Sequence, residues 1–377
     1  MANAIDLVKV IASVGVLQLR NMIVTPYLVY KPFQDTICQV GDTIKIPRPY
    51  SFQSNAMDPT VGVTAQDITD NMIEMKVDQW QEVTVKMNDL EATVQNRINL
   101  KKVVGDMIIP IVEKIEVSVI NQLTYNTSRA GSVGGVANAY LNPDKIVDIR
   151  TAQMLNKVPL TDRNNLFGLL SAKDEGALLK EEKFTNGQWT PDGGQALKNA
   201  MLAQRYGYSY FPSQLTSRPT IVDSSGLVNN GAGYAAGVST LVVDSFSAAP
   251  PEGSIVTFAN HSTPYTVDAG STTTSLKLKN ALSAAVVDNE AITVLDVNQN
   301  VFFHRNACAF APVPLSSSDG NYPGSIIGVA TDPVSGLSVR AEYYRDPNKK
   351  TNFLTLDALW GVKMLEEKLA YKYYTQS

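Results

Sequence analysis

The residue types that most often perform catalysis or bind metal ions are few in this sequence and lie far apart. The chain has two histidines, His261 and His304, and two cysteines, Cys38 and Cys308. The two histidines are too far apart in the sequence for the spacing of a metal site, and two distant cysteines make no zinc site. We therefore expect both histidines to be structural or surface residues. The sequence predicts no catalytic residue, no metal ligand, no bound cofactor and thus no enzyme.

Sequence motifs for nucleotide binding and hydrolysis are also missing. GxSxG, HExxH, CxxC and GxxxxGK followed by Ser or Thr do not occur. The glycine-rich stretch 231–237 precedes a predicted strand, so it offers no helix N-terminus to an anion. The acidic residues near the end of the first quarter of the chain are better explained as a solvated face than as a catalytic cluster. They are Asp67, Asp70, Glu74 and Asp78.

Charge and hydropathy exclude two further classes of protein. The 377 residues include 32 basic and 36 acidic ones, a net charge of -4, which gives no general attraction for nucleic acid. No apolar run approaches the roughly 18 residues of a membrane span, and no secretory signal is expected at the start. Charged residues make up 18% of the chain, below the roughly 25% of typical soluble domains. Such a low fraction suggests that much of the surface contacts partners.

The first third of the chain predicts a helical arm, a hairpin and a long helix. Apolar residues follow helical spacing over 4–31, and the stretch GDTIKIPRPYSFQ from Gly41 then alternates as a half-buried strand does. The run IEMKVDQWQEVTVKM repeats this alternation, so we interpret the two runs as one long two-stranded hairpin. An isolated ribbon is marginal in water, and we expect it to lie on something else. Apolar residues then recur every three or four positions from Leu100 to Tyr125, which predicts a long helix.

The remainder reads as an α+β region interrupted by β-structure. LNPDKIVDIRTAQMLNKV and DGGQALKNAMLAQR predict helices, whereas NLFGLLSA and YGYSYFP predict strands. Residues 218–297 hold short strand-like runs separated by turns, the pattern of a small all-β barrel inserted into the surrounding domain. The stretch GLSVRAEYYRD and the run around LDALWGVKML predict a closing hairpin packed against the long helix.

This order of segments resembles the major capsid proteins of tailed bacteriophages, which have the Hong Kong 97-type fold. GDTIKIPRP resembles the first strand of their extended loop, and VGDMIIPIVEKIEVSVI is similar to their proline-containing spine helix. VFFHRNACAFAPVPL resembles the strand that follows the inserted domain in coat proteins of the P22-like short-tailed phages. The chain is short for that group, and the insertion cannot be matched motif by motif.

The resemblance implies an α+β architecture of several parts. Its divisions are an N-terminal arm (1–35), an extended hairpin loop (36–90), a peripheral domain with the spine helix (91–135 and 337–377), an apical domain (136–217 and 298–336) and an inserted β-barrel (218–297). In this interpretation the hairpin contacts a neighbouring subunit. Its charged residues are therefore candidate contacts between subunits: Lys45, Arg48, Lys76, Glu82 and Lys86.

The resemblance further implies a structural subunit of an icosahedral head. Such subunits form hexamers and pentamers around a scaffolding protein, with a portal at one vertex. The shell expands as double-stranded DNA enters, and some shells carry decoration proteins. The protein would be part of the virion and would assemble in the cytoplasm of the bacterial host. One subtype cross-links its subunits through a lysine of the extended loop, and Lys45 and Lys76 lie in that region. The P22-like group does not cross-link, so we expect no covalent ladder.

Two other functions remain open from the sequence. A phage tail or baseplate protein would explain the Gly-, Ser- and Thr-rich β-structure, but not a long helix between hairpin and α+β region. An unrecognised hydrolase would need a pocket that holds two acidic residues close together, such as Asp174 and Glu175.

Overall fold

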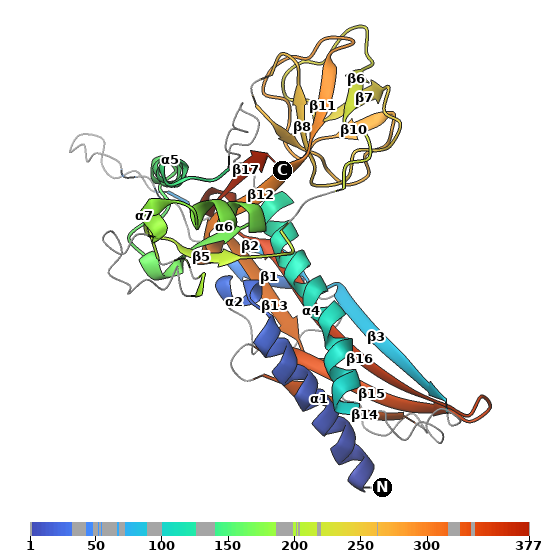
Figure 1. Cartoon of the computed structure of the whole chain (residues 1–377). Coiled ribbons are helices and arrows are strands. Elements are labelled where there is room, and N and C mark those ends of the chain that lie inside the picture. The colour runs from blue at the N-terminus through green and yellow to red at the C-terminus, as the bar shows by residue number, and fades with distance from the viewer. Residues whose placement is uncertain are drawn as a thin grey trace. The chain divides into compact units, whose positions relative to one another are not determined.

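A computed structural model describes most of the chain (Figure 1). The described residues are 2–31, 43–47, 72–88, 100–125, 140–185, 204–216, 220–261, 263–315, 325–332 and 336–376, with the isolated residues 52, 54, 66, 67, 199, 200 and 202. The chain divides into two units. The first comprises Met1–Asn21, Lys31–Ile111 and Phe310–Leu365, and the second comprises Met22–Tyr30, Val112–Ala309 and Glu366–Ser377.

Helix α1 (Ala2–Met22) confirms the predicted helical arm. Its buried side chains follow the expected three-and-four spacing: Val8, Ile11, Ala12, Val16 and Leu19. Gly15 lies where α1 meets two other elements of the first unit, since a Cβ placed there would be 3.8 Å from side-chain atoms of both Ile108 and Val339. The arm is therefore part of the core of the first unit.

The long helix α4 (Leu100–Tyr125) has the bounds predicted from the sequence, with Pro110 inside it. One apolar stripe of the helix is buried: Val104, Met107, Ile108, Ile111, Val112, Ile115, Val119, Ile120 and Leu123. Because α4 extends from one unit into the other, its stripe contributes to the core of both.

The first unit contains a five-stranded sheet with β16 (Thr351–Met364) at its centre. Its other strands are β13 (Cys308–Val313), β14 (Ser325–Thr331), β15 (Ser338–Asp346) and β3 (Gln79–Asn88). The predicted closing hairpin is confirmed, because β15 and β16 pair antiparallel from Arg340 opposite Asp357 to Asp346 opposite Thr351. Strand β16 pairs on its other side with β3.

The prediction of one long hairpin is wrong for β3. Among the described residues, strands β1 (Thr43–Pro47) and β2 (Met72–Lys76) form a ribbon of five residue pairs. The chain leaves this ribbon at Val77 and Asp78, and β3 then pairs with β16 instead of β1. Alternation of apolar and polar residues defines the two faces of a strand but does not identify its neighbour.

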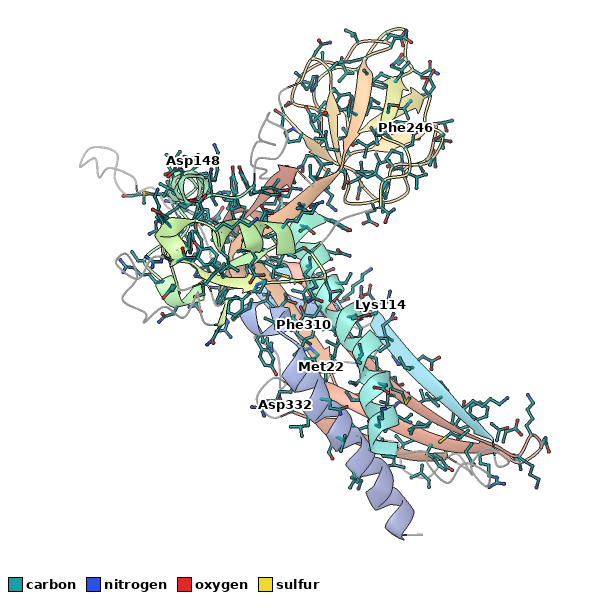
Figure 2. All side chains as sticks on the ribbon, in the orientation of Figure 1. Met22, Lys114, Asp148, Phe246, Phe310 and Asp332 are labelled. Carbon is teal, nitrogen blue, oxygen red and sulfur yellow. The ribbon has the colours of Figure 1, made fainter. Side chains whose placement is uncertain are left out.

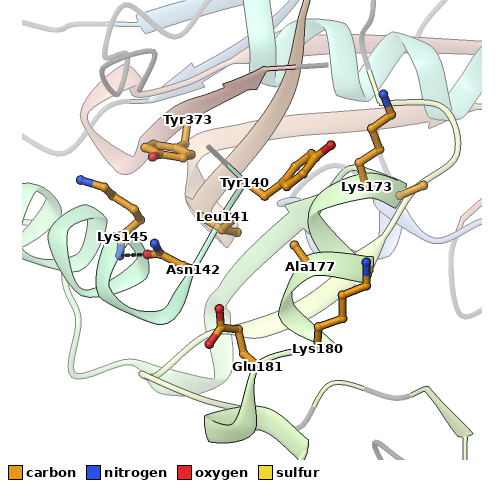
Figure 3. Close-up of a pocket in the computed structure, with 11 residues that line it drawn as sticks. Tyr140, Leu141, Asn142, Lys145, Lys173, Ala177, Lys180, Glu181 and Tyr373 are labelled. Atoms are coloured by element: carbon orange, nitrogen blue, oxygen red, sulfur yellow. Dashed lines mark hydrogen bonds between the residues drawn. The ribbon is translucent and has the colours of Figure 1, made fainter. Parts of the chain in front are cut away.

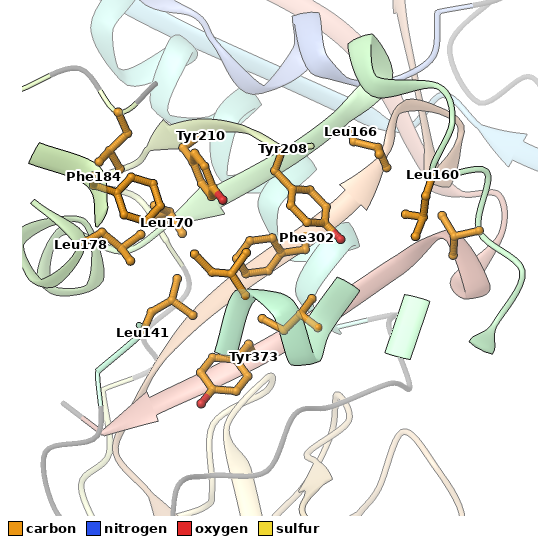
Figure 4. Packing of buried hydrophobic residues seen from close by; sticks show 14 residues of the cluster. Leu141, Leu160, Leu166, Leu170, Leu178, Phe184, Tyr208, Tyr210, Phe302 and Tyr373 are labelled. Atoms are coloured by element: carbon orange, nitrogen blue, oxygen red, sulfur yellow. The ribbon is translucent and has the colours of Figure 1, made fainter. Parts of the chain in front are cut away.

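The second unit contains a four-stranded sheet in the order β17-β12-β4-β5. These strands are β17 (Ala370–Gln376), β12 (Val297–His304), β4 (Leu166–Leu170) and β5 (Ser209–Pro212). Helices α5 (Pro143–Leu155), α6 (Ala172–Leu178) and α7 (Glu182–Thr185) belong to the same unit. Their apolar faces share one core with the sheet, in which Tyr208 packs edge-on against Phe302 (Figure 4).

Capping residues fix where these helices begin. The Asn142 side chain accepts a hydrogen bond from the Lys145 amide at the start of α5, and Ser171 does the same for Asp174 in α6. The short helix α2 (Thr25–Leu28) is held by Glu116 of α4, whose carboxylate accepts from the Val24 and Thr25 amides. The predicted helix over 192–205 lies mostly outside the described residues.

All six strands between Ser225 and Leu295 belong to one sheet, in the order β10-β7-β6-β11-β8-β9. They are β6 (Ser225–Val228), β7 (Thr240–Asp244), β8 (Ile255–Phe258), β9 (Tyr265–Thr266), β10 (Ser275–Lys277) and β11 (Ala291–Leu295). An isolated bridge between Val267 and Leu278 joins the two end strands. This β6–β11 sheet encloses its own apolar cluster, which includes Phe246 (labelled in Figure 2). The Phe246 ring packs against Gly226, where an added Cβ would be 2.2 Å from it.

Candidate functional site

Four of the five charged residues predicted as contacts lie on exposed strand positions. Lys45 of β1 is directly opposite Glu74 of β2, and both are exposed. Lys76 is the last residue of β2 and is exposed as well. Arg48 lies outside the described residues. Because opposed residues of an antiparallel pair point to the same side, the β1–β2 ribbon presents one charged face, with both signs of charge.

Glu82 and Lys86 belong to a second exposed row, on β3. Alternate residues of this strand face the same side, and the exposed row is Trp80, Glu82, Thr84 and Lys86, which we call the β3 strip. Its partners on β16 include Asp357 opposite Glu82 and Thr355 opposite Thr84. The predicted hairpin residues are thus divided between two strand pairs and do not form one row.

Trp80 is fixed in place by a charged pair beside it. The residue is 49% exposed, while its Nε1 donates to Oδ2 of Asp357 at 3.2 Å. Arg340 donates through Nε to Oδ1 at 3.1 Å and through Nη2 to Oδ2 at 2.5 Å, and its guanidinium lies 5.7 Å from the centre of the Trp80 ring. The carboxylate is buried but neutralised by this two-point contact. An exposed aromatic residue held so rigidly is typical of the residues that contribute most to protein–protein contacts.

The ribbon lies on its own chain. Its apolar side chains Ile44, Ile46 and Met75 are buried. The ribbon crosses β16 at Gly361, where an added Cβ would come within 2.6 Å of the Lys76 carbonyl oxygen. The support that we expected from a neighbouring subunit is therefore supplied, for this apolar face, by β16. The charged face is left for other contacts.

Both histidines make the contacts of structural residues. The buried His304 accepts through Nδ1 from the Asn306 amide, and its Nε2 lies 3.4 Å from Oδ2 of Asp162. His261 contacts the Tyr265 hydroxyl through Nδ1 at 2.8 Å and the Ala285 carbonyl through Nε2 at 3.2 Å. Within the described part of the chain, no three His, Cys, Asp or Glu side chains gather to hold a metal ion.

The acidic pair considered for hydrolysis does not form a catalytic site. Asp174 is completely buried and accepts from the Leu141 amide at 2.9 Å, Ser171 Oγ at 2.6 Å, Asn300 Nδ2 at 2.7 Å and Thr375 Oγ1 at 2.6 Å. With four donors, this carboxylate joins α6, β12 and β17 and is not available to a substrate. We call these five residues the Asp174 cluster. Burial raises the pKa of Glu175 above its usual value, but Glu175 has no acidic partner in this cluster.

A cavity of about 670 Å³ lies between α5 and α6, and neither acidic residue lines it (Figure 3). Its lining is Tyr140, Leu141, Asn142, Lys145, Ala172, Lys173, Gly176, Ala177, Lys180, Glu181 and Tyr373. Three lysines and one glutamate give it a positive rim, and Lys145 is also paired with Asp148 at 3.3 Å. The lining contains one acidic residue, Glu181, whereas the hydrolase considered above needs two acidic residues close together.

Sequence reasoning missed the residues that join distant segments. Asp174 was considered for catalysis, yet it is a structural acceptor, and the N-cap Ser171 three residues earlier was the available signal. Nothing in the sequence pairs Trp80 with Asp357, which lie 277 residues apart. None of the helices in the described ranges is long and apolar enough to cross a membrane.

Comparisons with known proteins identify the fold. The sequence matches no protein-family model and no curated protein. Among solved structures, a chain of Mycobacterium phage Che8 has a TM-score of 0.50 with 11% identity, over 93% of this chain and 90% of the other. The capsid of cyanophage P-SCSP1u gives 0.51 with 10% identity, over 91% and 85%. The mature capsid of bacteriophage PhiM1 gives 0.50 with 11% identity, over 92% and 88%.

These similarities extend over nearly the whole chain and show a common fold. The chain is a mixed α+β protein with the fold of phage capsid chains, as its order of segments predicted.

Proposed function

We propose that this protein is the major structural subunit of an icosahedral phage head. In this proposal it forms hexamers and pentamers that enclose double-stranded DNA. The proposal rests on the extent of the fold similarity. It covers 91% of this chain and 85% of the P-SCSP1u capsid chain, and 92% and 88% for PhiM1. A fold match over an isolated domain would support much less, because one domain can serve many functions.

The contacts of the candidate catalytic residues that the structure describes are those of structural residues, which supports this proposal. Asp174 accepts four hydrogen bonds from its own chain, and the lining of the cavity between α5 and α6 has one acidic residue, Glu181. The two histidines are used in contacts within the chain. Each of these observations agrees with a shell subunit, because the task of such a subunit is to make contacts and not to transform a ligand.

We further propose that the two charged rows make contacts between subunits. Lys45, Glu74 and Lys76 occupy one row, while Glu82 and Lys86 belong to the β3 strip around Trp80. Exposed ion pairs are individually weak, at about 0–1 kcal/mol each. A closed shell repeats them many times, so weak contacts add up to a stable particle while errors of assembly can still dissolve. We include Arg48 among the proposed contact residues because it directly follows β1 in the sequence.

The β6–β11 sheet corresponds in this proposal to an inserted barrel domain over 218–297. Its separate apolar cluster and the bridge between Val267 and Leu278 favour a closed, self-sufficient unit. The other divisions that we expect are the arm (1–35), the extended loop (36–90), the peripheral domain (91–135 and 337–377) and the apical domain (136–217 and 298–336).

The remaining partners follow from the same proposal. A scaffolding protein would direct a precursor shell that expands on packaging, a portal would occupy one vertex, and decoration proteins are optional. The net charge of -4 suits a container for DNA, because a strongly basic wall would bind the packaged phosphates. The protein would assemble in the host cytoplasm and remain in the virion.

Expression with and without the scaffolding protein tests this function. We expect closed shells of uniform diameter by negative-stain electron microscopy when both are present, and no covalent ladder when the shells are boiled in detergent. Tubes or sixfold rings in both cases would instead favour a tail or baseplate protein. A covalent ladder would place the protein in the cross-linking subtype.

A further inference from the structure

The β6–β11 sheet is attached to the rest of the second unit by a small buried junction. Its apolar part is a cluster of Ile255, Val297 and Tyr374. Beside it Gly253 packs directly on the Tyr125 ring, where an added Cβ would overlap the ring at 1.9 Å. The Gln299 side chain donates to the Gly253 carbonyl at 3.0 Å. The junction thus brings the C-terminal end of α4 to the turn before β8.

A lysine lies at the centre of this junction. Lys372 of β17 is 1% exposed, and its Nζ donates to the Thr124 carbonyl at 3.2 Å and to Thr266 Oγ1 at 2.5 Å. Thr124 belongs to the last turn of α4, and Thr266 belongs to β9. One amine therefore bridges the long helix, the β6–β11 sheet and the C-terminal strand.

The charges around this amine do not balance it. Glu367 favours the protonated amine and Lys279 disfavours it. Lys279 is itself near Asp268, with 3.8 Å between Nζ and Oδ1. The Tyr374 ring lies 5.7 Å from the amine, and the carbonyl end of α4 also favours a cation. Neither acceptor of the amine is a carboxylate.

We propose that Lys372 is a proton-controlled latch that holds the β6–β11 sheet to the end of α4. The neutral amine keeps both hydrogen bonds without a buried charge, so the latch is closed. The protonated amine carries a charge and a third N–H into the same site, so water entry and separation of the junction become easier.

The direction of the pH dependence follows from burial. Desolvation lowers the pKa of Lys372 to about 7, from the usual value near 10.4 when the amine is in water. Between these values the separated state binds more protons than the closed state. The equilibrium constant for closing the junction therefore increases as the pH rises above about 7, and it changes little with pH below about 7. This concerns the folded subunit itself and does not depend on the proposed role in a shell.

Amide hydrogen exchange of the soluble full-length chain tests the latch. We would measure the protection of the peptides that contain Thr266 and Lys372 at pH 6 and pH 8, after correction for the intrinsic exchange rate. With the two pKa values above, the equilibrium constant for closing the wild-type junction should increase about tenfold from pH 6 to pH 8. The Lys372→Met variant, which has no titratable amine, should lose this increase. The Lys372→Arg variant, which stays charged, should also lose it and should have lower protection at pH 8.

His261 is the matched control, because it is the one histidine between Ser225 and Leu295 and lies in the connection between β8 and β9. The His261→Gln variant should keep the tenfold increase. A wild-type profile that is flat between pH 6 and pH 8 would overturn the latch, and so would an unchanged increase in Lys372→Met. If neither Lys372 variant folds, the wild-type and His261→Gln profiles still decide, since a rise that disappears in His261→Gln assigns it to the histidine.

Discussion

The sheet of the first unit and the β6–β11 sheet of the second unit differ in how far apart their pairing partners lie along the chain. All strands of the β6–β11 sheet fall between Ser225 and Leu295, and their apolar side chains form one cluster. In the first unit β3 pairs with β16, so that Trp80 contacts a residue 277 positions away. The β6–β11 sheet is therefore specified by its own segment of the chain. The sheet of the first unit, in contrast, forms only when segments near both ends of the chain are folded.

This difference has a consequence for assembly. The long-range sheet also carries the exposed β3 strip, so the surface that we propose for contacts forms only in a completed subunit. A chain that is still folding would not present it. We expect the β6–β11 sheet to form independently of the long-range sheet, and we propose that its attachment to the rest of the second unit depends on the Lys372 junction.

The largest expected effect comes from breaking the helix on which both units depend. Ile111 and Ile115 of α4 are each 1% exposed. An aspartate at either position buries an unpaired carboxylate, which destabilises by about 4 kcal/mol or more. We expect no soluble protein from Ile111→Asp or Ile115→Asp. Glu113→Gln, on the exposed side of the same helix, should express normally. Wild-type yield and melting temperature in either aspartate variant would show that this stripe is not a core.

The next effect tests the long-range contacts of the second unit. Asp174→Asn replaces an acceptor of four hydrogen bonds with an amide whose NH₂ group faces donors. We expect a loss of about 2–4 kcal/mol in the free energy of unfolding, measured with urea. Glu175→Gln, one residue further on, removes a carboxyl outside this cluster and should change stability by less than about 0.5 kcal/mol. Equal stability of the two variants would contradict the structural role of Asp174.

A smaller effect tests the independence of the β6–β11 sheet. The excised segment 218–297 should fold alone, with a dispersed amide NMR spectrum. Within it, a Cβ at Gly226 would lie 2.2 Å from the Phe246 ring, whereas Gly231 has open space around it. Gly226→Ala should therefore destabilise the segment by about 1–3 kcal/mol, and Gly231→Ala should not. A collapsed spectrum for the unmodified segment would mean that this sheet needs the rest of the chain.

The smallest effect on the isolated subunit is expected at the β3 strip. Trp80→Ala removes a half-exposed ring and one hydrogen bond, so the free energy of unfolding should fall by about 1 kcal/mol or less. The yield of assembled shells should nevertheless fall severalfold, because the same loss is repeated at every contact. Val222→Ala, which shortens another exposed apolar side chain, is the control. Normal shells from Trp80→Ala would remove the β3 strip from the proposed contacts.

The elements with strong local patterns were predictable from the sequence. Helix α4 has its predicted bounds because three-and-four spacing persists over its whole length. The start of α5 at Asn142 and the strands β4, β5, β7, β8 and β11 also follow from local signals such as caps and turns. The match of the whole segment order to phage capsid chains was predictable for the same reason.

Pairings and buried polar contacts were not predictable. Alternation in residues 79–88 is equally compatible with β1 and with β16 as a partner, and the structure selects β16. In the sequence Asp174 and Lys372 look like ordinary surface charges. The contacts that join Asp174 to β12 and β17, and Lys372 to α4 and β9, each span more than one hundred positions. A single sequence holds no local signal for such contacts.

Cryo-electron microscopy of particles assembled from this chain would show whether it tiles a closed shell. We expect an icosahedral map in which every subunit has the described fold and the β3 strip contacts a neighbouring subunit. A helical tube, or a closed shell in which the β3 strip faces solvent in every copy, would contradict it.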